Sequence, residues 1–482
     1  MADPRLDHPL GREVRKAARF ALYASLTGVL ALLAVGMFSL RVLRPTEDVD
    51  RSWVDTDFNT EQVNLLQKYL QINTSQPNAD EISGARFLAS VLEAEGIPAH
   101  IEYLGERHAN VWAILEGKNP EALILHSHID TDPVTDLKDW VHPPFSGEIE
   151  RPYIYGRGAY DMKSIAVAEL ATMLALKRSG KPLSRSVIFL ATGTEEVGSD
   201  LGTRWVLAQH PEIGKRAWGF LTEGGVVETR AANEVKYWGI EFVQKHFVDV
   251  TVCGPSQEQL EGLRTELLEE RDQLSPETSF QATSTPELEA FLTHYGPTRD
   301  SERLRAILAR PRQLHLDGVA YSELPPYLRA FFRDEAIPFP VKEIAAGDYS
   351  MLIKMHLLPG ADTEEVLARL LPPWKRAGLS VAVHDEHSAD HGSPLDHPIY
   401  RSLEEELQKA FPDRPVGPQF LPYTATDSRW VRAAGIPAYG FSPFLVFSSE
   451  TFRIGLPNER ISLPAFLKGC EIYLRAVQQL VG

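Results

Sequence analysis

Cysteine is almost absent from this sequence, and basic residues are fewer than acidic ones. Only Cys253 and Cys470 occur in 482 residues, so the chain has neither a disulfide framework nor a zinc cluster made of cysteines. The 49 lysines and arginines are outnumbered by 66 aspartates and glutamates, which gives a formal net charge of −17. This balance predicts no basic groove and therefore no nucleic-acid partner.

Long apolar runs are also scarce, and the one that is long enough to cross a membrane lies near the N-terminus. Residues 20–40, FALYASLTGVLALLAVGMFSL, form an uncharged run of about the length that a helix needs to span a bilayer. Basic residues precede it, at Arg12, Arg15, Lys16 and Arg19. The sequence therefore predicts a single-pass membrane anchor with residues 1–19 cytoplasmic, a tether at 41–56, and the bulk of the chain extracytoplasmic. A cleaved signal peptide is the alternative, but the run is longer than usual and AVGMFS is a poor cleavage site.

Residues 57–246 alternate short apolar strands with amphipathic helices. Helices are expected where apolar residues recur at helical spacing, and strands where short, nearly continuous apolar runs occur. The expected helices are 60–72, 81–95 and 164–180, and the expected strands are 110–117, 122–128 and 186–194. Such strands between helices predict an α/β fold with a mostly parallel sheet that is covered by helices on both faces.

The pattern changes near residue 247. Residues 247–254 alternate like a strand of an open antiparallel sheet, and a charged helix is expected to follow. Further on come a strand, a helix and a strand, at 348–360, 362–378 and 379–387. Residues 247–387 are therefore expected to form an inserted α+β domain, after which the α/β domain resumes at 388–482. Between about 275 and 337 the sequence has no clear pattern.

Four clusters of acidic or histidine residues follow expected strands, where ligands bind in open parallel sheets. The first, HSHIDTDPV, contains His128 and Asp130, which face the same way if this segment is extended. The others contain Asp161 in YIYGRGAYDMKS, Glu195 and Glu196 in ATGTEEVGS, and Glu223 in FLTEGG. Each of these residues taken singly is more typical of a solvated loop, and His126 is more typical of a core histidine. Together they predict an imidazole-and-carboxylate site for two divalent ions, of which zinc suits these ligands best.

Five segments resemble one known family. The strings HSHIDTDPV, WVHPPFSGEIERPYIYGRGAYDMKS, GTEEVGS, LTEGG and TATDSRWVRAAGIPAYGFSP are similar, in order and spacing, to those of the aminoacylase/carboxypeptidase S family of dinuclear zinc amidohydrolases and peptidases. The similarity runs from about residue 57 to the C-terminus. It implies a zinc-peptidase-like α/β domain, interrupted by a ferredoxin-like lid or dimerisation domain through which two copies would pair.

The resemblance also implies a role for each matching ligand. His128 and Glu223 would hold one zinc ion, and Asp130 would orient the imidazole. Asp161 would bridge to a second zinc ion, which Glu196 would also hold.

Catalytic and substrate-binding roles follow from the same resemblance. Glu195 would be the general base that takes a proton from metal-bound water. Arg429 would bind a substrate carboxylate, and His356 stands where the family has a substrate-binding arginine. A histidine is not equivalent there, because its charge at neutral pH depends on its surroundings.

One ligand of the family is missing. In FRIGLPNERIS, Gly455 occupies the position of a histidine that would complete the second zinc site, and no histidine follows His397. Histidines do occur in the return from the inserted domain, at His384, His387, His391 and His397, but a polar, exposed linker is the favoured interpretation of that segment.

Two functions therefore remain open. The first is a membrane-anchored zinc hydrolase of amide or peptide bonds next to a free carboxylate, acting on N-acyl amino acids or dipeptides. The second is a catalytically weakened relative that keeps one zinc ion and serves as a binding or scaffold protein. The intact base favours the first, and the missing histidine favours the second. We adopt the first, with one or two zinc ions for which cobalt or manganese can substitute.

Overall fold

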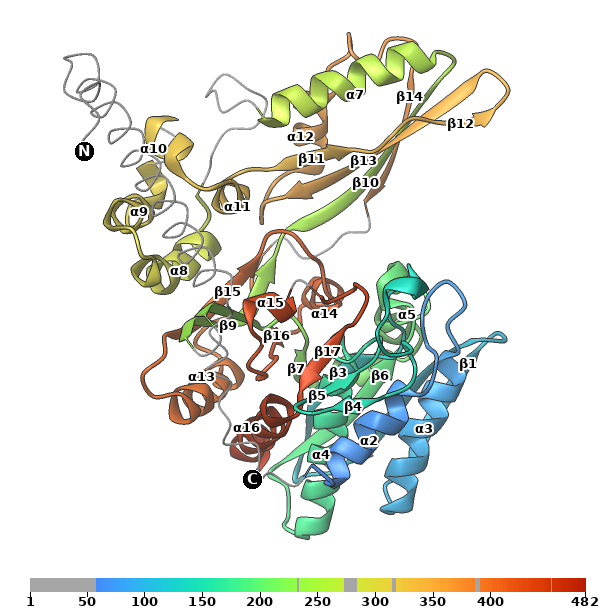
Figure 1. Cartoon of the computed structure of the whole chain (residues 1–482), viewed down its shortest axis with the longest axis vertical. Coiled ribbons are helices and arrows are strands. Elements are labelled where there is room, and N and C mark those ends of the chain that lie inside the picture. The colour runs from blue at the N-terminus through green and yellow to red at the C-terminus, as the bar shows by residue number, and fades with distance from the viewer. Residues whose placement is uncertain (1–57, 232–233, 273–283, 314–317, 386–390, 452) are drawn as a thin grey trace, which may run out of the picture.

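The computed structural model of the protein describes residues 58–231, 234–272, 284–313, 318–385, 391–451 and 453–482. The expected anchor at 20–40 and its flanking segments lie outside these residues. Of the helices that are described, none has both the length and the apolar composition of a membrane span. The chain forms a larger unit, at the bottom of Figure 1, and a smaller unit above it.

The larger unit is built on a nine-stranded sheet. Its strands in spatial order are β1 (Ala99–Leu104), β2 (His108–Leu115), β6 (Arg185–Thr192), β3 (Asn119–His128), β7 (Ala217–Thr222), β16 (Ala438–Gly440), β9 (Glu234–Gln244) and β15 (Val416–Leu421), with β8 (Val226–Ala231) paired to β9.

The sheet contains both parallel and antiparallel pairs, so the prediction of a mostly parallel sheet holds only for some of its strands. The central strands β6, β3, β7 and β16 are parallel, and so are β9 and β15. The pairs β1–β2, β2–β6, β16–β9 and β8–β9 are antiparallel. Residues 105–107 are all that joins β1 to β2, and so short a link permits only an antiparallel pair.

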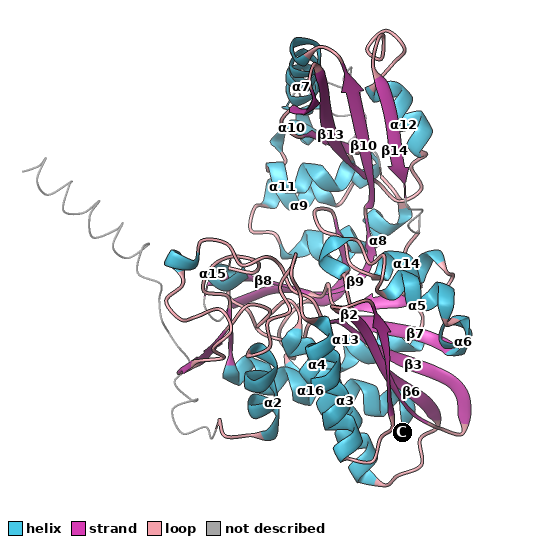
Figure 2. Ribbon diagram, turned by 90° about the vertical axis from the view of Figure 1, so that its right-hand side faces the viewer, coloured by secondary structure: helices cyan, strands magenta, loops and turns pink. Residues whose placement is uncertain are grey.

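Helices cover both faces of this sheet (Figure 2). One face carries α2 (Glu61–Leu70), α3 (Glu81–Ala94), α4 (Lys163–Ser179), α13 (Pro398–Ala410) and α16 (Leu463–Val481), and the other carries α5 (Thr203–Gln209), α6 (Pro211–Arg216) and α14 (Ser428–Ala433). In β3, Leu123 and Leu125 face the first set whereas Ala122 and Ile124 face the second, because successive side chains of a strand point to opposite faces. The continuous apolar run of β3 is thus buried on both sides.

The smaller unit is a five-stranded antiparallel sheet with two helices. Its strands are β11 (Glu335–Pro338), β13 (Asp348–Leu357), β10 (His246–Gly254) and β14 (Ser380–Asp385) in spatial order, with β12 (Lys342–Ala345) paired to β13, and its helices are α7 (Gln257–Asp272) and α12 (Thr363–Leu370). Alternate residues of β10, including Val248 and Val250, pack with Leu260 of α7 in a separate core. The helix expected to run to 378 ends at Leu370, because Pro372 and Pro373 cannot continue its hydrogen bonding.

Short helices occupy much of the stretch that has no clear sequence pattern. They are α8 (Pro286–Tyr295), α9 (Glu302–Leu308), α10 (Gly318–Glu323) and α11 (Pro326–Arg329). Their apolar side chains, such as Phe291 and Leu308, belong to the core of the larger sheet. These helices are short and prolines interrupt them, so no sustained helical periodicity is visible in the sequence.

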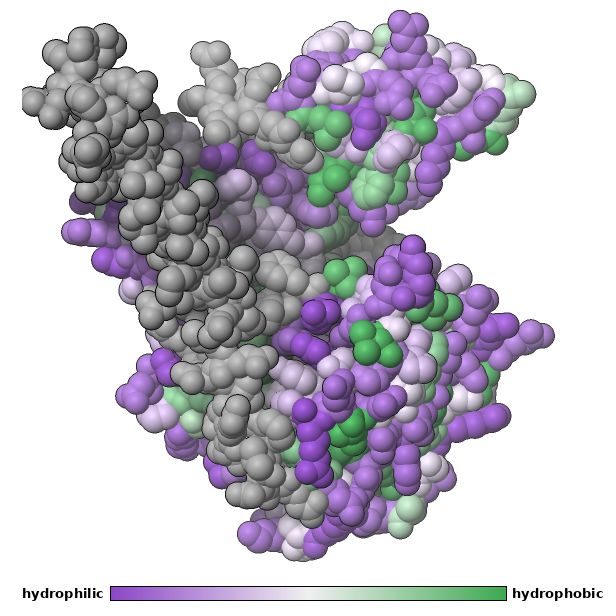
Figure 3. Space-filling model, in the orientation of Figure 1, coloured by the Kyte–Doolittle hydropathy of each residue, from purple (hydrophilic) through white to green (hydrophobic). Residues whose placement is uncertain are grey.

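A third, three-stranded sheet brings the C-terminal region to the site. It pairs β17 (Arg460–Ser462) with β5 (Tyr153–Tyr155), which in turn pairs with β4 (Ile149–Glu150). Residues about 300 positions apart in the sequence therefore lie side by side, and the segment with Gly455 meets the loop with Asp161. The surface of Figure 3 is largely hydrophilic and is hollowed between the two units.

Candidate metal centre

The expected site residues gather at the carboxyl ends of three parallel strands. His128 is the last residue of β3, Glu223 follows β7, and Asp161 ends the loop before α4. Glu195 and Glu196 begin a short 3-10 helix, Glu195–Val197, that follows β6. Because β6, β3 and β7 are neighbours in the sheet, these residues from distant parts of the sequence converge on one edge.

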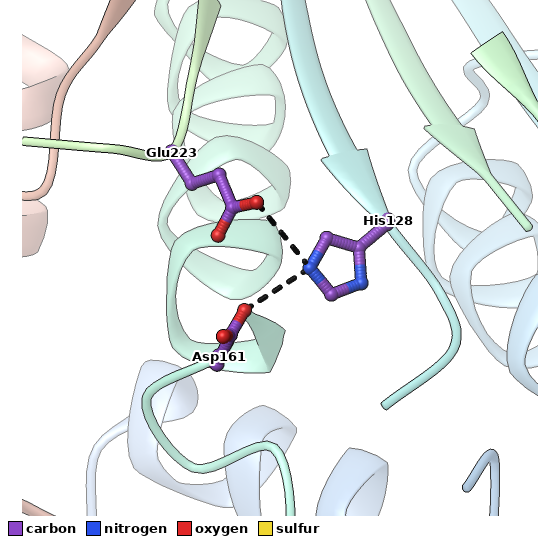
Figure 4. Close-up of side chains that lie close together, drawn as sticks. All are labelled: His128, Asp161 and Glu223. Carbon is purple, nitrogen blue, oxygen red and sulfur yellow. Dashed lines mark hydrogen bonds and ion pairs between the residues drawn. The ribbon is translucent and has the colours of Figure 1, made fainter. Parts of the chain in front are cut away.

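His128, Asp161 and Glu223 point toward one another (Figure 4). Nε2 of His128 lies 3.1 Å from Oδ1 of Asp161 and 3.7 Å from Oε1 of Glu223. One ligand atom of each residue lies within 4.8 Å of the ligand atoms of the other two. Among the described residues, these three side chains are the group that meets this spacing. One imidazole nitrogen and two carboxylates at this spacing fit a single divalent cation such as zinc.

The backbone of Asp130 orients the imidazole of His128. Nδ1 of His128 lies 2.8 Å from the carbonyl oxygen of Asp130, whereas the nearest carboxylate oxygen of Asp130 is 3.7 Å away. A carbonyl oxygen only accepts, so Nδ1 carries the hydrogen and Nε2 faces the two carboxylates. Asp130 thus orients the imidazole, as the resemblance implied, but mainly through its main chain.

The carboxylate of Asp130 instead holds the two glutamates. It accepts the backbone N–H of Glu195 at 3.0 Å and that of Glu196 at 3.2 Å. Its Oδ2 also accepts a hydrogen bond from the side-chain amide of Gln76, at 2.9 Å. Since Asp130 is fully buried, this carboxylate is a rigid support for the segment that carries the expected base.

Negative charge is concentrated at this edge of the sheet. Burial raises the pKa of Glu196 to about 11 and that of Glu223 to about 7, and in both the neighbouring charge of Asp161 adds to the effect. Burial and the nearby Asp427 likewise raise the pKa of Glu195 well above its ordinary value. Against the effect of burial, the charge of Glu223 and the hydrogen bond to Asp161 raise the pKa of His128 well above its ordinary value, so without a metal the imidazole supplies positive charge that a bound cation would replace.

The two expected substrate-binding residues lie in different surroundings. Arg429 is in the first turn of α14, partly exposed, with its guanidinium 4.7 Å from the centre of the Trp430 ring. Its charge is near enough to lower the pKa of Glu195, against the effect of burial. Arg429 therefore borders the site.

His356 lies in the smaller unit, on β13. It is 7% exposed, and its ring centre is 4.2 Å from that of Phe247. Burial, with a contribution from the charge of Lys245, lowers the pKa of His356 to about 4. The imidazole is therefore neutral at neutral pH and has no charge to offer a carboxylate, and the structure does not bring it to the metal ligands.

Glu459 has a supporting role that the sequence does not indicate. One oxygen of its carboxylate accepts the backbone N–H groups of Tyr160 and Asp161, at 2.9 Å and 3.3 Å. The other oxygen accepts from Arg157 at 2.7 Å, and both of these charged side chains are buried. The only sequence signal was the string FRIGLPNERIS, in which the resemblance attached a role to position 455 but none to Glu459. The structure shows that Glu459 fixes the loop that delivers Asp161.

The histidines of the return segment do not join the three clustered ligands. His384 lies on β14 in the smaller unit, and His397 caps the N-terminus of α13, where its Nδ1 accepts the backbone N–H of Ile399. His387 is outside the described residues. Within the described part of the chain, the metal ligands thus include no histidine besides His128.

Comparison with known proteins agrees with this fold. Residues 124–479 match the profile of Peptidase family M20/M25/M40. Aminoacylase-1A of Rattus norvegicus is 26% identical over 438 residues, which cover 87% of this chain and 95% of that protein. The M20 family metallo-carboxypeptidase Sso-CP2 from Sulfolobus solfataricus superposes with a TM-score of 0.63 at 16% identity, over 87% of this chain and 99% of its own. Human carnosine dipeptidase 1 superposes with a TM-score of 0.59 at 14% identity, over 86% and 96% of the two chains.

Proposed function

Because the chain belongs to peptidase family M20/M25/M40 and is a metal-dependent hydrolase of amide bonds, we propose that it cleaves an amide next to a free carboxylate. N-acyl amino acids and dipeptides are the proposed substrates. The observation that carries this proposal is the convergence of His128, Asp161 and Glu223, with a free glutamate, Glu195, beside them.

We propose that zinc is the metal held by His128, Asp161 and Glu223. When bound, zinc acidifies a coordinated water and polarises the carbonyl of the amide. The protein's part is to fix Nε2 of His128 toward the cation through the Asp130 carbonyl, and to hold Asp161 through Glu459. Both supports are buried, so the ligands keep their positions without reorganising when substrate binds.

Glu195 is the proposed general base. Adjacent residues diverge from the chain, so Glu196 can face a cation while Glu195 stands beside the substrate. A carboxyl group with a raised pKa can take up a proton near neutral pH and then deliver it to the leaving amine. The hydrogen bond from the backbone N–H of Glu195 to Asp130 fixes the main chain from which this side chain extends.

Arg429 is the proposed binding group for the substrate carboxylate. A guanidinium offers a planar set of donors that matches a carboxylate, and no ion pair engages Arg429 among the described residues. Its distance from the base is short enough for the two charges to interact. A substrate carboxylate held there would place the adjacent amide next to Glu195.

We also propose roles for the remaining parts of the chain. The five-stranded unit within 247–387 would act as a lid over the hollow of Figure 3 and pair two copies of the chain. Residues 20–40 would anchor the enzyme as a single span, with the catalytic unit outside the cytoplasm. The full-length chain should then stay in the membrane fraction after carbonate treatment, and its release into the supernatant would contradict an anchor.

A substrate panel tests the proposed activity. Purified full-length protein would be assayed for amine release from N-acyl amino acids and dipeptides, with zinc, cobalt or manganese added. The same compounds with the carboxylate blocked as an amide would be assayed alongside. We expect hydrolysis that chelators abolish, and a preference for the free carboxylate. Metal binding without hydrolysis of any compound would instead favour the second candidate, a one-zinc binding or scaffold protein, which the glycine at position 455 supports.

A further inference from the structure

Asp132 occupies the space next to Gly455. A Cβ atom added to Gly455 would lie 2.5 Å from Oδ2 of Asp132, which is closer than real Cβ contacts, and φ at Gly455 is +73°. A side chain at 455 and the carboxylate of Asp132 would therefore compete for the same place. We infer that Asp132 supplies the ligand that Gly455 lacks, and that Asp132, Asp161 and Glu196 form a second cation site.

The backbone around Asp132 is well anchored. The preceding residue, Thr131, donates its N–H to the carbonyl of Thr74 and accepts the N–H of Gln76, both at 2.9 Å. Asp132 also lies two residues beyond Asp130, in the segment that leaves β3. The carboxylate of Asp132 therefore extends from a main-chain segment whose position is fixed by hydrogen bonds.

The positive groups nearest Asp132, Arg157 and His128, are already paired with other carboxylates. The carboxyl group of Asp132 lies within hydrogen-bonding reach of that of Glu196 and close to the charge of Asp161. The nearest guanidinium, Arg157, is committed elsewhere, since it donates to Glu459, to the carbonyl of Pro133 and to that of Gly455. Asp161 has His128 as its partner, whereas Asp132 and Glu196 have no ion pair with a basic side chain in the described part of the chain.

Glu196 supplies an independent indication of a ligand. Its Oε1 atom is buried and has no hydrogen-bond partner among the described residues. A buried polar oxygen without a partner is costly, and such atoms in native proteins commonly mark an ion or water site. The three carboxylates are not all within 4.8 Å of one another, as the group around His128 is, so their side chains would have to close around a bound cation.

The donor set also predicts how this second site selects its metal. It offers carboxylate oxygens only, because the imidazole of the family is replaced. Oxygen donors suit harder cations such as Mn²⁺, whereas the imidazole of the first site suits Zn²⁺. The second site is therefore inferred to discriminate less strongly against manganese than the first site does, with Asp161 shared between the two cations.

Metal counting tests the inference on the full-length chain. Protein dialysed against Zn²⁺, Mn²⁺ or both would be analysed for metal per chain, and Mn²⁺ titrations would be followed by electron paramagnetic resonance. We expect two cations per chain and, when both metals are supplied with Mn²⁺ in excess, Mn²⁺ at the second site while Zn²⁺ keeps the first. Asp132→Asn should retain one and weaken the second by at least about 100-fold, because it loses a charged ligand. Asp139→Asn, an exposed change nearby, is the matched control and should retain two.

A swap of the two positions sharpens the test. Asp132→Ala combined with Gly455→His should restore binding of a second cation and shift its preference toward Zn²⁺, despite the strain that φ of +73° imposes on a histidine there. Gly455→His alone should gain less, because its side chain must first displace the carboxylate of Asp132. One cation per chain in the wild type, or two in Asp132→Asn, would overturn the inference. The inference rests on the proposed function only for its first metal site, and a metal count does not depend on turnover, so failure of one is distinguishable from failure of the other.

Discussion

The carboxylate of Asp130 accepts the backbone N–H of Glu195 at 3.0 Å, inside the core and two residues beyond the end of β3. A second bond to the backbone of Glu196 makes this one side chain the support of both glutamates. Asp130 is therefore a positioning residue for the proposed base, Glu195, as well as for His128. Five predictions follow from this and the neighbouring contacts.

Asp130→Asn should lower kcat by about 10- to 100-fold with little loss of the first metal ion. The asparagine keeps the backbone carbonyl that orients His128, but its amide group has only one oxygen, so one of the two glutamate N–H groups loses its acceptor. Steady-state kinetics and metal analysis would be compared with those of Asp200→Asn, an exposed aspartate. Loss of metal at an unchanged kcat would show that the carboxylate serves His128 instead.

Glu195→Gln should lower kcat by about 100- to 10,000-fold, the usual contribution of a general base, while leaving KM and metal content nearly unchanged. The amide has the size of the carboxyl group but cannot accept the proton. The exposed change Glu212→Gln serves as the control. A kcat that stays within a few fold of the wild type would assign the base to another residue.

Metal affinity should fall as the pH falls below about 7. Burial and the charge of Asp161 raise the pKa of Glu223 to about 7, so below that pH its proton competes with the cation. The pKa of His128 is also raised above its ordinary value, by Glu223 and Asp161 against the effect of burial, so its proton must be displaced as well. For each proton that the cation must displace, the affinity for the metal should fall about tenfold per unit decrease in pH. Calorimetric titration with Zn²⁺ in buffers of different ionisation enthalpy measures the protons released. Binding that releases none would contradict this account.

His356→Leu should make the smaller unit less sensitive to acid. The pKa of His356 is about 4 in the folded state against about 6.5 unfolded, so as the pH falls between these values only the unfolded chain takes up the proton. Folding stability is then lost progressively, by on the order of 3 kcal/mol at most. The charged groups that face this ring are Lys245, Lys354 and Glu335, and they remain in the variant.

Urea midpoints at pH 7 and pH 4.5 measure this effect. The difference between the two midpoints should be smaller in His356→Leu than in the wild type, and unchanged in His100→Gln, where the histidine is exposed. An equal acid sensitivity in wild type and His356→Leu would mean that other groups govern it.

Arg429→Ala should raise KM for substrates with a free carboxylate by about 10- to 100-fold, the effect of losing a charged hydrogen-bond partner of roughly 1.5–3 kcal/mol. Substrates with a blocked carboxylate should be affected little. Arg204→Ala is a close control, because its guanidinium also lies against the Trp430 ring, at 5.2 Å, but pairs with exposed Asp200. A similar KM change in both variants would indicate that the lost contact with the Trp430 ring causes it, rather than the loss of a group that binds the substrate carboxylate.

Much of the site was predictable because its determinants are local. The apolar run of β3 ends at His128, and polar residues that directly follow a buried parallel strand necessarily emerge at its carboxyl edge. The same reasoning places Glu195, Glu196 and Glu223. Helix ends were also predictable, as at Gly180, which closes α4 in the left-handed conformation with φ of +61°.

Other features depend on contacts that no local pattern encodes. The hydrogen bonds from Tyr160 and Asp161 to Glu459 join residues about 300 positions apart, and the close approach of Asp132 to Gly455 spans a similar separation. Which strands pair in parallel, whether a histidine such as His356 is charged, and whether a missing ligand has a replacement are all decided by packing. The residue types and their order along the chain determine that a metal can be bound at this sheet edge. Only the folded chain determines which distant side chains reach it, because burial and charge there are set by neighbours brought together by folding rather than by sequence.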